Sequence, residues 1–148
     1  MIAYKLTGAD GYTRRGQAGE TLWEVDSTVK PQGEGTGPCG PGVLHLYASP
    51  EEAVLYNPIH ANIGLPRLFL VEAAGIAGDD GLKQWTTGSV QVVEELDMPE
   101  ITTEERVAFA ICISPHVSTR EWAVGWLLGA DRSAAAAYRT AAELLLEE

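Results

Sequence analysis

His45 and Tyr47 carry side chains that could do chemistry at one site. They belong to the apolar run Val43–Tyr47. Alternate residues of an extended chain point to opposite faces, so His45 and Tyr47 share one side while Leu44 and Leu46 share the other. An imidazole exchanges protons near neutral pH, and a tyrosine ring can stack on a ligand. The pattern allows a polar site lined by both residues. The alternative is a structural histidine beside a half-buried strand tyrosine.

Asp79 and Asp80 form the second candidate group, directly before Gly81. A catalytic carboxylate at Asp80 is one interpretation. A turn is the other, because aspartate tolerates turn geometry and hydrogen-bonds its own backbone.

Several other chemistries find no support in the sequence. The three histidines show no ligand spacing with one another or with the cysteines, so we predict no metal site. Cys39 lies in a loop rich in glycine and proline, and Cys112 lies on an apolar helical face, so we expect two independent reduced thiols. The Gly-x-Ser-x-Gly, His-Glu-x-x-His and Walker-type patterns do not occur.

The net charge of −11 limits the partners that we expect. Such a surface repels nucleic-acid phosphates, and Arg14-Arg15 is the only adjacent pair of basic residues. We therefore expect no direct nucleic-acid binding. An acidic surface favours a basic partner protein, although solubility alone is a sufficient reason for it.

The chain shows no signal for membranes or secretion. No apolar run approaches the ~20 residues of a membrane helix. The segment Met1–Leu6 lacks the basic start, apolar run and cleavage site of a secretory signal. We expect a cytoplasmic protein without membrane contact.

Strand signals dominate the first hundred residues. β-branched and aromatic residues, and alternation of apolar side chains, predict five strands. Their ranges are Ile2–Leu6, Leu22–Val25 (with Trp23 and Val25 on one face), Val43–Tyr47, Arg67–Ala73 and Val90–Leu96. The segment Lys30–Gly42 is too rich in glycine and proline for a helix or a continuous strand, so we predict a loop there, either mobile or shaped by a ligand.

Helix signals appear once between the strands and then dominate after Pro99. Ser49 as N-cap, Pro50 at the first position and Glu52 in a capping box predict a short helix that ends before Pro58. Capping boxes also begin at Thr102 and Ser118, the first helix running to Pro115 and the second ending at Gly129. Asp131 caps an alanine-rich last helix. Trp122 and Trp126 are four residues apart, which indicates a core stripe; the alternative is an exposed docking surface.

These signals together predict an α+β fold. The length of 148 residues suits one domain (1–148) with one substantial core. A small mixed or antiparallel β core occupies residues 1–100, and C-terminal helices occupy residues 101–148.

The segment 45–96 resembles the second half of the ADP-ribosyltransferase fold, most closely the rifampin-type enzymes. His45-Leu-Tyr47-Ala-Ser49 and the helix after it resemble the family's His-x-Tyr strand and its helix. Arg67-Leu-Phe-Leu-Val-Glu-Ala-Ala-Gly75 resembles the strand that ends in Val-Glu-x-x-Gly. Gly78-Asp79-Asp80 falls where the family has an acidic pair, and Ser89–Leu96 resembles its final strand.

This resemblance implies an NAD-using or NAD-derived-nucleotide-binding protein of the ADP-ribosyltransferase type. Tyr47 would stack on nicotinamide, which gains ~1–2 kcal/mol when desolvated. Asp80 would stabilise the oxocarbenium-like charge that develops as nicotinamide leaves. His45 would line the same nucleotide site.

The first strand departs from the family pattern. The family's ribose-binding histidine followed by Gly-Thr has no counterpart in Ile2–Thr7. Lys5, Arg14 or Arg15 would then serve as donors to the pyrophosphate. The missing histidine also favours a second hypothesis, a non-catalytic interaction or inhibitor protein of the same fold that binds a basic partner protein.

A second resemblance concerns the segment Cys39-Gly-Pro-Gly-Val-Leu-His45. It is similar to the Cys-x-x-Gly-aromatic-His signature of an uncharacterised family of phage and bacterial proteins. This similarity implies phage ancestry, and hence a place in the host cytoplasm, without implying an activity.

Overall fold

The computed structural model describes residues 1–114, 120–133 and 135 of the chain. The chain divides into two compact units, Met1–Glu100 and the residues from Ile101 onward. The first unit is rich in strands and the second is helical, so the protein is an α+β protein with a β-rich core and C-terminal helices. Within the described ranges, no helix is both long enough and apolar enough to cross a membrane.

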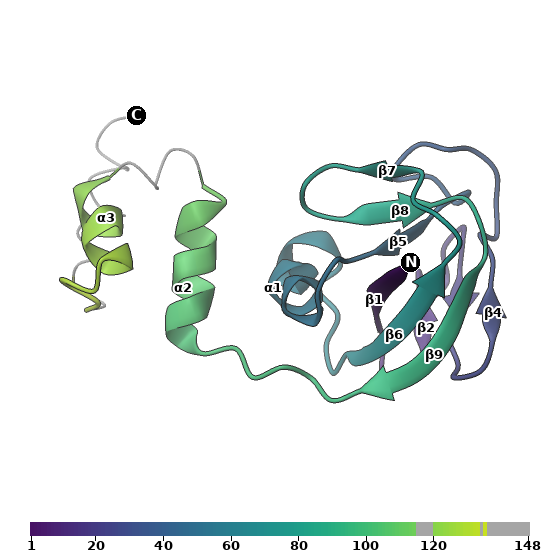
Figure 1. Ribbon diagram of the computed structural model, residues 1–148, viewed down its shortest axis with the longest axis horizontal. Coiled ribbons are helices and arrows are strands. Elements are labelled where there is room, and N and C mark those ends of the chain that lie inside the picture. Colours follow the sequence, from purple (N-terminus) through teal and green to yellow (C-terminus); the bar gives the residue numbers. More distant parts are fainter. Residues whose placement is uncertain (115–119, 134, 136–148) are drawn as a thin grey trace. The chain divides into compact units, whose positions relative to one another are not determined.

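The first unit contains two antiparallel sheets, a β-hairpin and one helix (Figure 1). The elements are β1 (Ile2–Thr7), β2 (Tyr12–Thr13), β3 (Thr21–Leu22), β4 (Thr28–Val29), β5 (Leu44–Leu46), α1 (Pro50–His60), β6 (Arg67–Ala73), β7 (Gly78–Asp79), β8 (Gln84–Thr86) and β9 (Val90–Leu96). The larger sheet has the order β1-β6-β9-β4, the smaller has the order β5-β8-β7, and β2 pairs with β3. An isolated antiparallel bridge between Tyr4 and Tyr47 links β1 to the end of β5.

The core of this unit is built from the inward faces of both sheets. In β6 the alternation of side chains buries Phe69, Val71 and Ala73, and in β9 it buries Val90 and Val92. Trp23 fills the space between the strands and is fully buried. The complete cluster is Ala3, Trp23, Val29, Leu44, Leu46, Phe69, Val71, Ala73, Val90 and Val92.

Four of the five predicted strands are confirmed. Arg67–Ala73 and Val90–Leu96 have the predicted bounds, Ile2–Leu6 gains one residue, and Val43–Tyr47 shortens to Leu44–Leu46. The prediction of Leu22–Val25 was wrong beyond Leu22. The Trp23 N–H still donates to the Gly11 carbonyl oxygen, but the chain then turns at Glu24–Ser27, where Asp26 has a φ of 66°. Trp23 is therefore buried while Val25 is 43% exposed, and the two do not share a face.

Helix α1 begins at the predicted residues and ends later than predicted. The predicted capping box is only half present, because the Glu52 carboxylate accepts from the Ala48 N–H at 3.2 Å and not from the Ser49 N–H. The Ser49 hydroxyl accepts from the Glu52 N–H at 3.1 Å, and Pro50 is the first helical residue. The helix continues through Pro58 to His60 because a proline in the last turn removes only one backbone hydrogen bond. The Asn57 side chain secures this turn. It accepts from the Ile63 N–H at 2.8 Å and donates to the Ile63 carbonyl at 2.9 Å.

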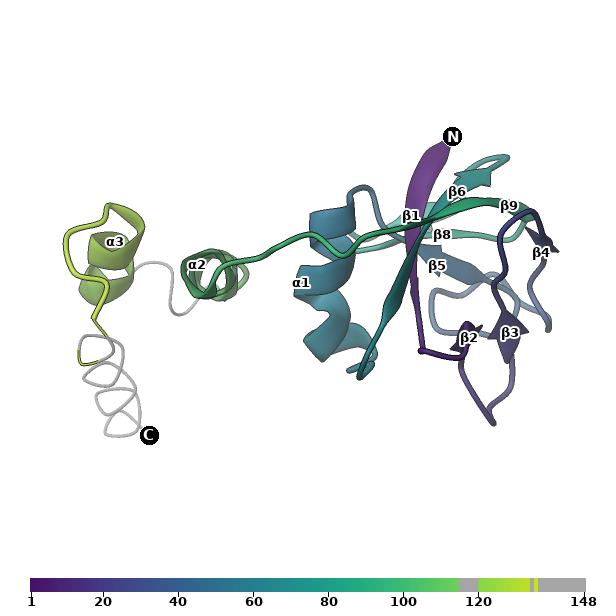
Figure 2. The same cartoon turned by 90° about the horizontal axis from the view of Figure 1, so that it is seen from below.

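Helix α1 and the β2–β3 hairpin lie on opposite sides of β1. The two views in Figures 1 and 2 agree on this arrangement. The loop 30–42 contains neither helix nor strand, as predicted. It folds back on itself, since a side chain at Gly42 would collide with the backbone of Gly35. The loop, the hairpin and α1 together surround the cavity described below.

The second unit contains α2 (Thr103–Cys112) and α3 (Glu121–Leu127). The capping box at Thr102 is present in both directions. Gly129 ends α3 with a φ of 76°, as predicted. Trp126 packs with Ile111 and Ala123 in a small core, and Trp122 packs against it, so the tryptophan pair is a core stripe. The predicted cap at Ser118 and the last helix after Asp131 lie outside the described residues.

Candidate anion-binding site

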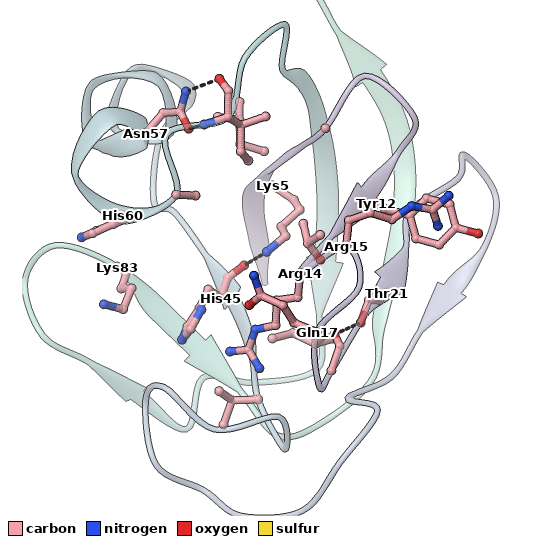
Figure 3. Close-up of a pocket in the computed structure, with 18 of the residues that line it drawn as sticks. Lys5, Tyr12, Arg14, Arg15, Gln17, Thr21, His45, Asn57, His60 and Lys83 are labelled. Atoms are coloured by element: carbon pink, nitrogen blue, oxygen red, sulfur yellow. Dashed lines mark hydrogen bonds between the residues drawn. The ribbon is translucent and has the colours of Figure 1, made fainter.

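A cavity of about 710 Å³ opens in the first unit, next to the middle of β1 (Figure 3). Its walls come from β1, from the β2–β3 hairpin and from β5. Cys39 from the loop 30–42, the last turn of α1 and Lys83 from the β7–β8 turn complete it. These segments are far apart in the sequence, and the two sheets and their connections bring them together.

Six basic side chains of the described residues line this cavity. They are Lys5, Arg14, Arg15, His45, His60 and Lys83. Among the residues that the structure describes around the cavity, Asp10 alone is acidic. The whole chain carries 21 acidic and ten basic residues apart from histidine. Four of those ten lysines and arginines therefore line one cavity in a strongly acidic protein, which favours an anionic ligand.

Lys5 lies at the floor of the cavity, in the middle of β1. The residue is 7% exposed. Its Nζ donates to the His45 carbonyl oxygen at 2.8 Å and lies 4.8 Å from the centroid of the Trp23 ring. No carboxylate of the described chain lies within ion-pair distance of it. Burial, and secondarily the charge of Arg14, lower the pKa of the Lys5 amine from 10.5 to about 7.

The adjacent arginines Arg14 and Arg15 have different surroundings. The backbone of Arg14 is left-handed, with a φ of 54°, and its Nη1 donates to the Gly40 carbonyl oxygen at 2.8 Å. Its charge acts on both Lys5 and His45. Arg15 instead stacks on Tyr12 and pairs with carboxylates of Asp10 and Glu20 at 3.3 Å each. Of these two arginines, Arg14 is therefore the one without a carboxylate partner among the described residues.

His45 is held neutral by its surroundings. Its backbone carbonyl accepts from Lys5, and its ring Nε2 contacts the Pro38 carbonyl oxygen. Burial lowers the pKa of the imidazole to about 4, and the charges of Lys5, Arg14 and Lys83 act in the same direction. At neutral pH the ring carries no charge and therefore has a single N–H. Because a carbonyl oxygen can only accept, this hydrogen lies on Nε2, which donates to the Pro38 carbonyl oxygen.

Tyr47 belongs to a stack of three rings at the α1 side of the cavity. Its ring stacks with Tyr56 at 6.4 Å and with His60 at 5.9 Å, and Tyr56 stacks with His60 at 5.2 Å. The Tyr47 hydroxyl hydrogen-bonds His60 Nδ1 at 2.9 Å. Burial, and secondarily the charge of Asp80, raise the pKa of Tyr47 to about 12. With 7% of the residue exposed, little of the ring face is free.

Asp80 does not line the cavity. Its Oδ1 accepts from the N–H groups of Leu82 and Lys83 at 3.0 and 2.9 Å, and its Oδ2 lies 3.5 Å from Lys83 Nζ. The backbone hydrogen bond from Lys83, ahead of that from Leu82, lowers the pKa of this carboxyl group. Asp80 thus organises the turn between β7 and β8, which is the alternative that the sequence left open.

Five of the six predicted site residues line one cavity: Lys5, Arg14, Arg15, His45 and Tyr47. Whether they bind a ligand is a separate question, treated below. The sequence patterns did not predict His60 or Lys83 as site residues. His60 was not predicted because α1 was expected to end before Pro58. The signal in the sequence for a longer helix was Asn57, whose side chain stabilises the extra turn. Lys83 follows the Asp79-Asp80 turn, and nothing in its sequence neighbourhood pointed to a cavity.

Comparisons with known proteins return nothing for this chain: no family model, no curated protein and no solved structure matches it.

The arrangement is suited to binding phosphate groups. A guanidinium forms charge-assisted hydrogen bonds to phosphate oxygens, and a lysine amine contributes a point charge when protonated. Among the described residues, Lys5 donates to the His45 carbonyl oxygen and Arg14 donates to the Gly40 carbonyl oxygen, and neither donates to a carboxylate. Among residues 1–114 and 120–133, no three His, Cys, Asp or Glu side chains come together as a metal site requires.

Proposed function

We propose that the first unit binds a phosphorylated small molecule in this cavity, with NAD and ADP-ribose as the first candidates. One observation carries the proposal. Lys5 and Arg14 converge on a cavity in a protein of net charge −11, and within the described chain neither has a carboxylate partner. An anion would offset the electrostatic cost of placing these two groups together.

The size of the cavity supports a ligand of this class. Its volume of about 710 Å³ lies within the ~300–1,000 Å³ typical of small-molecule sites. Polar groups that can orient a ligand lie around it, including His60 at the α1 side. The pyrophosphate of NAD would bind at Lys5 and Arg14, the role that the sequence gave to these residues.

Ligand binding is proposed ahead of ADP-ribosyl transfer. Transfer would need a carboxylate beside the ribose, and Asp80 bonds to the backbone of its own turn. It would also need a free face on Tyr47, which already stacks with Tyr56 and His60. Transferase activity therefore depends on a rearrangement of both groups when a ligand binds.

The test is a thermal-shift titration of the wild-type protein with NAD, ADP-ribose and inorganic pyrophosphate. A ligand at one hundred times its Kd stabilises the folded state by about 2.7 kcal/mol, which raises the Tm by several degrees. We expect a saturable shift with at least one of these ligands. Nicotinamide release is then measured for NAD to test transfer.

The Arg14→Asn variant supplies the matched comparison. Asparagine tolerates the left-handed backbone of residue 14 better than other non-glycine residues do, so the hairpin is expected to keep its shape. We expect Arg14→Asn to bind the ligand at least roughly tenfold more weakly than the wild type does, since charged hydrogen bonds contribute about 1.5–3 kcal/mol. The control is Arg106→Gln, which removes one positive charge at an exposed position of α2. Equal affinity of the two variants would contradict the proposal.

A flat response to all three ligands up to millimolar concentration would reject the proposed site. The interaction-protein hypothesis would then take its place. It predicts a stable complex with a basic protein and no nucleotide dependence.

A further inference from the structure

Lys5 has surroundings that a structural lysine does not need. The residue is nine-tenths buried, and it lines the cavity. The groups that face the amine are the His45 carbonyl oxygen, the Trp23 ring and the cationic Arg14. A buried lysine that serves only the fold is normally paired with a carboxylate, because an uncompensated charge is costly inside a protein.

We propose that the Lys5 amine forms an imine with the aldehyde carbon of a phosphorylated aldehyde bound in this cavity. This inference rests on the proposed function, since it takes the phosphate to be held at Arg14. It narrows the class of ligand from phosphorylated molecules in general to those that carry a reactive carbonyl.

The hydrogen-bond geometry leaves the amine free to react. A neutral lysine amine has two N–H groups and one lone pair. One N–H donates to the His45 carbonyl oxygen at 2.8 Å, and this bond fixes the direction of the side chain. A carbonyl oxygen accepts but does not donate, so it cannot occupy the lone pair. The lone pair therefore stays available for a carbonyl carbon in the cavity.

The electrostatics of the cavity maintain the reactive form. Desolvation and a neighbouring cation are the two effects that activate lysine nucleophiles, and both act on Lys5. With a pKa of about 7, about half of the Lys5 amines are neutral at pH 7. For an ordinary lysine with a pKa near 10.4, the neutral fraction at that pH is on the order of one in 3,000.

The reaction consumes no oxidant or reductant. The Lys5 lone pair attacks the aldehyde carbon, and the carbonyl π electrons move to oxygen. Transfer of one proton from nitrogen to that oxygen gives a carbinolamine. Loss of the hydroxyl group with a second proton from nitrogen releases one water and leaves a C=N double bond. One amine and one aldehyde thus give one imine and one water.

The other two lysines serve as internal references. Lys30 is exposed in the loop 30–42 and does not line the cavity. Lys83 lines the cavity, but its Nζ lies 3.5 Å from the Asp80 carboxylate, an ion-pair partner that Lys5 lacks among the described residues. The sequence contains three lysines in all, so every lysine adduct can be assigned.

The experiment is reductive trapping on the intact wild-type protein at pH 7. Pyridoxal 5′-phosphate serves as the probe aldehyde, borohydride fixes the imine, and peptide mass spectrometry locates the adduct. We expect labelling at Lys5 at least about tenfold above that at Lys30. Pyridoxal, which lacks the phosphate, should label Lys5 much less. Arg14→Asn should lower the labelling of Lys5 by the phosphorylated probe and leave Lys30 unchanged.

Each of the opposite results overturns the inference. Comparable labelling of Lys5 and Lys30 would show that Lys5 is not an activated amine. Equal trapping of pyridoxal and its phosphate at Lys5 would reject the phosphorylated class of substrate. A Tm shift with ADP-ribose, lost in Arg14→Asn, without trapping at Lys5 would leave the proposed function standing and refute the imine alone. Absence of both the shift and the adduct would refute both.

Discussion

The floor of the cavity and the β7–β8 turn both carry basic side chains, but these side chains have a carboxylate partner only at the turn. At the turn, Lys83 pairs with the Asp80 carboxylate, which also accepts two backbone hydrogen bonds. At the floor, and among the described residues, Lys5 and Arg14 have only carbonyl oxygens as hydrogen-bond partners. A neutralised charge organises its own loop, whereas a charge without a counter-ion remains available to a ligand and destabilises the fold until one arrives.

The largest expected effect comes from removing the charge of Lys5. Between about pH 7 and 10.5 the Lys5 amine binds fewer protons in the folded chain than in the unfolded chain. Its contribution to the free energy of unfolding therefore rises with pH across that window. Below pH 7 the cost of burial is fully present. Lys5→Met keeps the volume of the stem and removes the charge. We expect a gain of about 2–4 kcal/mol at pH 6 and little gain at pH 10.

Urea unfolding of both proteins at pH 6 and pH 10 measures this difference. Lys83→Met is the matched control, because its amine has a carboxylate partner in the turn and should show no gain. If Lys5→Met were no more stable than the wild type at pH 6, the distinction between the two regions would fail.

A second prediction concerns acid. The unfolded chain binds a proton at His45 between about pH 4 and 6.5 while the folded chain does not, so stability falls as the pH falls through that range. His45→Gln keeps a side-chain donor for the Pro38 carbonyl and removes the titration. The Tm of the variant should depend less on pH between 6.5 and 4. His60 has a pKa lowered by burial as well, so part of the slope should remain. A slope identical to that of the wild type would be the contrary result.

The smallest effect is expected at Asp80. The side-chain oxygen of an asparagine can still accept hydrogen bonds from the N–H groups of Leu82 and Lys83. Asp80→Asn therefore loses only the ion pair with Lys83. Exposed pairs of this kind contribute at most about 1 kcal/mol, and ADP-ribose binding should persist. A tenfold or greater loss of binding in the titration would move Asp80 from the turn into the site.

The sequence predicted the elements that follow a local pattern. β6 and β9 were located exactly, because alternating apolar residues of the β-branched and aromatic types have no competing interpretation there. The start of α1 and the capping box at Thr102 were also local, since the residues involved are three positions apart. The predictions failed at Val25 and Pro58 because contacts that the apolar pattern does not reveal decide the backbone there. In the first case these are the bonds of the Glu24–Ser27 turn, where the Ser27 N–H donates to the Glu24 carbonyl oxygen, and in the second the bonds between the Asn57 side chain and Ile63.

The site was predicted as residues but not as an arrangement. Lys5 and His45 are forty positions apart, and their contact follows from the Tyr4–Tyr47 bridge, which no periodicity reveals. The different surroundings of Arg14 and Arg15 depend on a left-handed backbone at one residue. Nothing in an Arg-Arg pair predicts which of the two side chains pairs with carboxylates.

Cys39 gives this molecule a native attachment point for a spectroscopic reporter. It is a free, exposed thiol in the loop 30–42, and it lines the cavity. Cys112 is the other free thiol, on α2, and Cys112→Ser would leave Cys39 as the single cysteine of the chain. A fluorophore on Cys39 would be attached next to Gly40, whose carbonyl oxygen accepts from Arg14. A ligand that recruits Arg14 must compete for that bond, so the emission of the label would turn occupancy of the cavity into an optical signal.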